Sequence, residues 1–162
     1  MSIATKGITV AGWCLLGSVA VTVVASFLPW YSISILGLTA SANAWNSVWW
    51  IPTVVAVGVA IVYALGAFNT LAMSTKAHLA LPIAGLVSFV LTLIFLIDIL
   101  VEGTDVVQLG DSGSMVGDTV ASSGPSFGLF ISLLATGATA YFAAVVAQES
   151  GANLPFRVRG PR

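Results

Sequence analysis

Three acidic residues in the second half of the chain are the strongest candidates for chemistry. Asp98, Glu102 and Asp105 are spaced i, i+4 and i+7, so a continuous helix would place them on one face. Neighbouring carboxylates repel one another and attract a cation. Counting about 1.5 Å per residue from Leu79 places Asp98 about 29 Å along a helix, near the edge of a bilayer. We therefore expect a solvated helix end, with a weak Ca²⁺ site or a contact with a basic partner as alternatives.

The other reactive residue types are too few for a catalytic or metal site. His78 is the only histidine and Cys14 the only cysteine, so a haem held by two histidines or a multi-cysteine zinc site cannot form within this chain. Neither a Gly-x-Ser-x-Gly motif nor a phosphate-binding loop is found. The sequence predicts no enzymatic activity and no cofactor.

Composition indicates an integral membrane protein. Apolar residues make up 58 % of the 162 residues and charged residues 7 %, whereas soluble domains have about 25 % charged residues. With a net charge of -1 and only five lysine and arginine residues, the chain lacks the basic surface that nucleic-acid binding requires. We expect a single all-α membrane domain that does not bind nucleic acid.

Four apolar runs of bilayer length predict four transmembrane helices in an up-and-down bundle. Pro29 closes the first run, and Pro52 and Pro82 are expected in the opening turns of the second and third. The predicted spans cover residues 8–28, 50–71, 79–101 and 127–147. The outer loops cover residues 30–48 and 102–126, and a tail covers residues 148–162.

Charge placement predicts the orientation of the bundle. With four spans, every basic residue lies on one side: Lys6, Lys76, Arg157, Arg159 and Arg162. Because basic residues mark the cytoplasmic side, both termini are expected in the cytoplasm and the protein in the plasma membrane. Cleavage of a signal peptide at residues 42–44 is the competing reading, but that site lies too far beyond the first apolar run.

Aromatic residues support this orientation. Trp30, Tyr31, Trp49 and Trp50 cluster where the first two spans reach the outer interface, as aromatic belts do. Trp45 lies in the loop between them and is a candidate for outer-face contact.

Small residues recur at every fourth position around the fourth span. The ladder consists of Gly124, Gly128, Ser132, Thr136, Ala140 and Ala144. Such a strip allows another backbone to approach closely, so a helix is expected to lie against it. That helix belongs either to the same bundle or to another subunit.

Two stretches resemble a known group of membrane proteins. Ser26-Phe27-Leu28-Pro29-Trp30-Tyr31 with the later Asn43-Ala44-Trp45, and Gly124-Pro125-Ser126-Phe127-Gly128-Leu129, resemble small four-span membrane proteins of actinobacteria, most of which have no assigned activity. The resemblance implies a cell-envelope setting and transfers no site residues.

These observations favour a non-enzymatic accessory or scaffold subunit of a plasma-membrane or cell-envelope complex. It would act through helix packing and outer-loop contacts, with lipids and other membrane subunits, or itself, as partners. A small oligomeric channel or carrier is the alternative, and a lipid-acting enzyme is the reading with least support.

Overall fold

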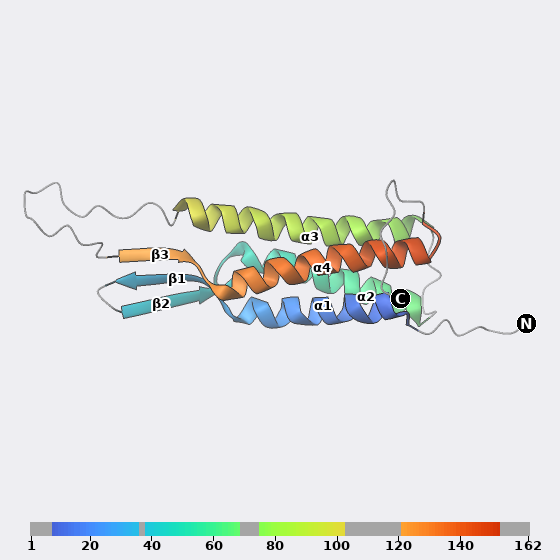
Figure 1. Cartoon of the computed structure of the whole chain (residues 1–162), viewed down its shortest axis with the longest axis horizontal. Coiled ribbons are helices and arrows are strands. Elements are labelled where there is room, and N and C mark those ends of the chain that lie inside the picture. Colours follow the sequence, from blue (N-terminus) through green and yellow to red (C-terminus); the bar gives the residue numbers. More distant parts are fainter. Residues whose placement is uncertain (1–7, 36–37, 69–74, 103–120, 153–162) are drawn as a thin grey trace, which may run out of the picture.

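The computed structural model describes residues 8–35, 38–68, 75–102 and 121–152. Four long helices form an up-and-down bundle, which confirms the predicted fold class (Figure 1). They are α1 (Val10–Phe27), α2 (Ile51–Ala67), α3 (Thr75–Glu102) and α4 (Phe127–Glu149). α1, α3, α4 and the helical stretch Val48–Ala67 that ends with α2 are each long and apolar enough to cross a membrane. α1 begins and α4 ends at the same end of the bundle (Figure 1).

Local sequence explains most helix boundaries. The side chain of Thr9 caps α1 by accepting a hydrogen bond from the Gly12 amide at 3.2 Å. α1 ends because Leu28 precedes a proline and adopts an extended conformation. α3 begins earlier than predicted, so Pro82 lies inside the helix and not in its opening turn. Membrane helices tolerate an internal proline where neighbouring groups compensate for the lost hydrogen bond.

A small antiparallel sheet projects from one end of the bundle, which we call the outer end. Its strands are β1 (Pro29–Ile35), β2 (Leu38–Asn43) and β3 (Ala121–Pro125), in the order β2-β1-β3. The strands run roughly along the helix axes (Figure 1). Two short 3₁₀ helices, η1 (Ala44–Asn46) and η2 (Val48–Trp50), lead from β2 into α2. Most of these residues fall in the predicted outer loops 30–48 and 102–126, whereas Trp50, the last residue of η2, falls in the predicted second span.

The two faces of the sheet differ in chemistry. Ile33 of β1 pairs with Ala40 of β2 and Ser123 of β3, whereas Ser32 pairs with Ser41 and Gly124. Because side chains alternate between faces, Tyr31 and Ile33 share one face with the apolar positions of β2, and the serines of β1 share the other. None of the three strands contains a charged residue.

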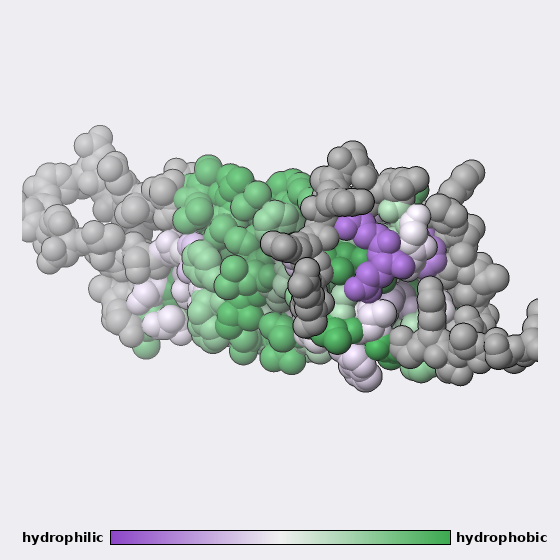
Figure 2. Space-filling model, turned by 45° about the vertical axis from the view of Figure 1, so that its right-hand side comes forward, coloured by the Kyte–Doolittle hydropathy of each residue, from purple (hydrophilic) through white to green (hydrophobic). Residues whose placement is uncertain are grey.

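Two apolar clusters lie at different depths in the molecule. The outer cluster, Trp30, Ala44, Ile99 and Leu129, joins the start of the sheet to α3 and α4. The inner cluster includes Leu15, Val59, Tyr63, Leu81 and Val146. Figure 2 shows a broad hydrophobic band over the helices, bounded by paler surface at the sheet and hydrophilic surface near the opposite end. That band is typical of a bundle embedded in lipid.

Candidate functional site

The small-residue ladder packs largely inside the chain's own bundle. Gly124 is an exception to the prediction because it lies in β3, before α4 begins. A Cβ atom at Gly128 would lie 2.6 Å from the Pro29 carbonyl oxygen, so only glycine allows α4 to start against the α1–β1 junction. Ser132 and Thr136 are fully buried. These positions therefore offer no open strip to a second subunit.

α3 supplies the second close contact of the ladder. A Cβ atom at Gly85 would lie 2.9 Å from the Ala140 Cα atom. Ala144, one turn further along α4, is also buried, with 5 % of its surface exposed. The small side chains thus let α3 and α4 approach closely, as membrane helix interfaces commonly require.

Buried hydroxyl groups from all four helices lie between the two apolar clusters. The described residues include nine buried polar side chains, all of them serine or threonine: Ser18, Thr22, Ser26, Thr53, Ser88, Thr92, Ser132, Thr136 and Thr139. We call this set the hydroxyl seam. The spacing of Ser18, Thr22 and Ser26 at every fourth position is the signal in the sequence that could have predicted part of this seam.

Two hydrogen bonds of the hydroxyl seam connect neighbouring helices. Ser18 Oγ and Thr139 Oγ1 are 2.9 Å apart and link α1 to α4, and Ser88 Oγ donates to the Pro52 carbonyl oxygen at 2.8 Å and links α3 to α2. Most threonines instead donate to the carbonyl oxygen four residues earlier, as Thr92 does to Ser88 at 2.9 Å. Some hydroxyl groups of the seam therefore link neighbouring helices, and others bond to backbone carbonyl groups of their own helix.

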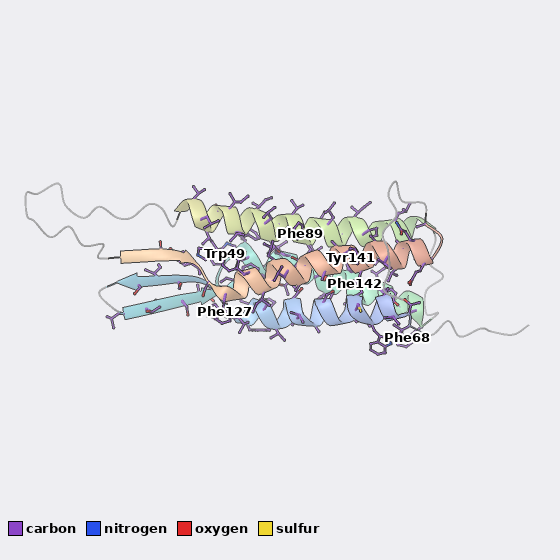
Figure 3. The ribbon with its side chains drawn as sticks, viewed as in Figure 1. Trp49, Phe68, Phe89, Phe127, Tyr141 and Phe142 are labelled. Carbon is purple, nitrogen blue, oxygen red and sulfur yellow. The ribbon has the colours of Figure 1, made fainter. Side chains whose placement is uncertain are left out.

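Asp98 lies near the outer end of the bundle. Gly85 and Ala140 meet at one depth, thirteen residues separate Gly85 from Asp98, and thirteen separate Ala140 from Phe127. At about 1.5 Å per residue both distances are about 20 Å, so Asp98 is level with the start of α4. Its side chain is exposed. Figure 3 shows Phe127 and Trp49 at this same end of the bundle.

The predicted acidic face is only partly described by the structure. Asp98 belongs to the final turns of α3 and Glu102 is its last residue. Asp105 lies outside the described residues, so the common face of the three carboxylates stays a prediction. Within the described ranges, no three residues of the types His, Cys, Asp and Glu come together as a metal site would need.

Trp45 is held in place by its neighbours at the outer end. Its indole N–H donates to Ser26 Oγ at 3.1 Å, and its ring stacks on Phe27 with the centroids 5.7 Å apart. The backbone N–H of Trp45 also donates to Asn43 Oδ1 at 3.0 Å. With 46 % of its surface exposed, Trp45 both anchors η1 to α1 and contributes to the outer surface.

The outer sheet is anchored to the bundle by further contacts. Trp30 is fully buried, and its indole N–H donates to the Ala25 carbonyl oxygen at 2.9 Å. The Ser126 amide donates to the Trp30 carbonyl oxygen at 2.8 Å, which ties the start of α4 to β1. The sheet therefore continues the bundle and is not attached by a free linker.

The sequence contains a strand signal for β1 within the predicted outer loop. Tyr31-Ser32-Ile33-Ser34-Ile35 alternates apolar and polar residues with the period of a strand. β3 has no comparable signal, because its five residues are small or are proline.

Comparisons with known proteins do not extend this picture. No protein family, curated protein or solved structure matches the chain.

Proposed function

We propose that the protein is a non-enzymatic accessory or scaffold subunit of a plasma-membrane or cell-envelope complex. The observation that supports this most is the uncharged outer sheet, which the Trp30 and Trp45 contacts fix to a membrane-spanning bundle. A fixed platform outside the bilayer can bind a partner with little ordering cost. The small-residue ladder, in contrast, is used largely for the protein's own packing.

The orientation is part of the proposal. All five lysine and arginine residues lie in the first 7 residues, at position 76 or after residue 156. In a four-span chain these positions share one side, which the positive-inside rule assigns to the cytoplasm. The sheet then lies on the extracytoplasmic side.

Affinity purification from native membranes in mild detergent tests the proposed function. We expect one or a few membrane or envelope proteins to co-purify in fixed stoichiometry. A matched chain in which residues 30–43 are replaced by a flexible glycine-serine linker should lose them while retaining the four spans. A monomer without stoichiometric partners in both preparations would contradict the proposal.

The hydroxyl seam supports a small channel or carrier as a second candidate. Thr53 Oγ1 and Ser132 Oγ have no hydrogen-bond partner among the described residues, although both residues are buried. Buried hydroxyl groups without a hydrogen-bond partner are suited to binding water or a small neutral solute. Glycerol permeability of proteoliposomes tests this candidate. A flux that Ser132→Val abolishes would favour it, and vesicles no more permeable than protein-free controls would oppose it.

A further inference from the structure

Within the part of the chain that the structure describes, one edge of the outer sheet has no neighbouring strand. Among these residues β2 pairs only with β1, and its first four residues, Leu38 to Ser41, are exposed. In an antiparallel pair, alternate residues direct their N–H and C=O groups away from the partner strand. β2 therefore presents a row of unpaired backbone groups on its free side.

Edges of this kind normally carry protection against pairing. Natural sheets block them with charged residues, especially lysine, or with proline or a covering element. β2 has the sequence Leu-Thr-Ala-Ser-Ala-Asn and contains neither a charge nor a proline. The opposite edge differs, because the outer end of α3 contacts β3.

Residues 1–7 and 153–162 cannot supply a strand for β2. Residues 1–7 and 153–162 join the described chain at the end of the bundle opposite the sheet (Figure 1). A ten-residue tail extends at most about 36 Å. α4 alone is about 35 Å long, so such a tail would be used up before it reached the sheet.

A second copy of the chain does not fit the edge either. Two copies inserted in the same orientation and related by a twofold axis along the membrane normal would bring two β2 strands together in parallel. The same residues would then face each other at the same height. In a parallel pair, a residue whose N–H and C=O groups point toward the partner strand lies opposite a residue whose groups point away from it. This twofold axis makes opposite residues equivalent, so it excludes regular parallel pairing.

We propose that the free edge of β2 binds an extended segment of a different protein by backbone pairing. The added strand would continue the ladder already formed between β1 and β2. Its side chains would alternate, with apolar ones beside Leu38 and Ala40 and small polar ones beside Thr39 and Ser41. This inference rests on the proposed accessory function and names how the partner is held.

A defined peptide tests whether the edge accepts a strand. The probe is a blocked six-residue peptide of alternating threonine and valine, added to the full chain in lipid nanodiscs. Amide hydrogen exchange of residues 38–43 is measured by mass spectrometry. We expect the peptide to slow this exchange about tenfold, because pairing occupies the outward amides. The same peptide N-methylated at every residue should have no effect, because neither of its edges then carries an N–H group that could complete the ladder.

Charge substitutions provide the matched control. Ser41→Lys places a charge on the edge strand and should abolish the slowing, whereas Asn46→Lys adds the same charge on exposed η1 and should leave it intact. Thr39→Lys is the second edge variant should Ser41→Lys not fold. Unchanged exchange with the peptide would overturn the proposal, as would equal behaviour of the edge and control variants. Slow exchange of every β2 amide in the free chain would also overturn it, because another segment of this chain would then cover the edge.

The outcome is separable from that of the proposed function. If partners co-purify but the peptide leaves β2 exchange unchanged, the accessory function stands and edge pairing fails. If the peptide protects β2 but no partner co-purifies, edge pairing stands and the accessory function fails.

Discussion

Two glycine-to-alanine substitutions should differ in their effect on stability, because one glycine is at a helix contact and the other faces open space. A Cβ atom at Gly85 would lie 2.9 Å from the Ala140 Cα atom and 3.3 Å from its backbone nitrogen. Carbon atoms pack best at about 3.5–4.0 Å, so this methyl group comes about 0.6–1.1 Å too close. A Cβ atom at Gly58 meets nothing within 4 Å. Gly58 lines an apolar groove of about 220 Å³ between α2 and α3, where a methyl group has room.

The size of the difference follows from two terms. Replacing glycine by alanine in a helix interior gains about 1 kcal/mol of helix propensity, and both variants share this gain. Overpacking at Gly85 costs about 1–3 kcal/mol, because the obstacle is backbone and cannot rotate away. Gly58→Ala should therefore stabilise the fold by about 1 kcal/mol. Gly85→Ala should be less stable than Gly58→Ala by about 1–3 kcal/mol.

Equilibrium unfolding with sodium dodecyl sulfate in mixed micelles, followed by circular dichroism, measures both variants. A Gly85→Ala protein as stable as Gly58→Ala would refute the close contact between α3 and α4. It would also remove the argument that the ladder is used for internal packing.

Three further predictions concern the hydroxyl seam, the outer end and the orientation. A double-mutant cycle of Ser18→Ala and Thr139→Val should show a coupling of about 0.6 kcal/mol in the free energy of unfolding, typical of hydrogen bonds between membrane helices; full additivity would argue against the bond. Trp45→Phe keeps a ring for stacking and loses the indole hydrogen bond, so it should cost about 1 kcal/mol in the same assay, and Trp45→Ala should cost more. In a background free of the natural cysteine, Asn46→Cys should react with a membrane-impermeant maleimide on intact cells, and Ser150→Cys only after permeabilisation; the reverse pattern would invert the proposed topology.

The membrane bundle could be predicted from local sequence. Each spanning helix forms its backbone hydrogen bonds within itself, so the length of an apolar run and the proline or polar residues that bound it are enough to locate the helix. The predicted span 127–147 therefore differs from α4 (Phe127–Glu149) by only two residues at one end. The start of α3 differs from the prediction, because the helix begins at Thr75 and Pro82 lies inside it.

The candidate site was predicted only in part. The structure places Asp98 level with the start of α4, and its position at a membrane interface stays a prediction. The ladder was recognised as a contact strip, but its partner could not be named, since spacing along one helix carries no information about which helix lies opposite. Gly124 was assigned to the ladder by period alone, and the strand that contains it depends on pairing with Ser32.

The sequence by itself determined that this is a four-span membrane protein with its basic residues on one side. The free energy of placing a segment in the bilayer depends on the residues of that segment alone, so it can be read from local sequence. Tertiary structure decided the outer sheet, the hydroxyl seam and the free edge of β2. Each of these depends on residues distant in the chain: Ser18 meets Thr139 across 121 positions, and Tyr31 pairs with Pro125. Such contacts form only when the bundle brings the segments together, so local periodicity cannot specify them.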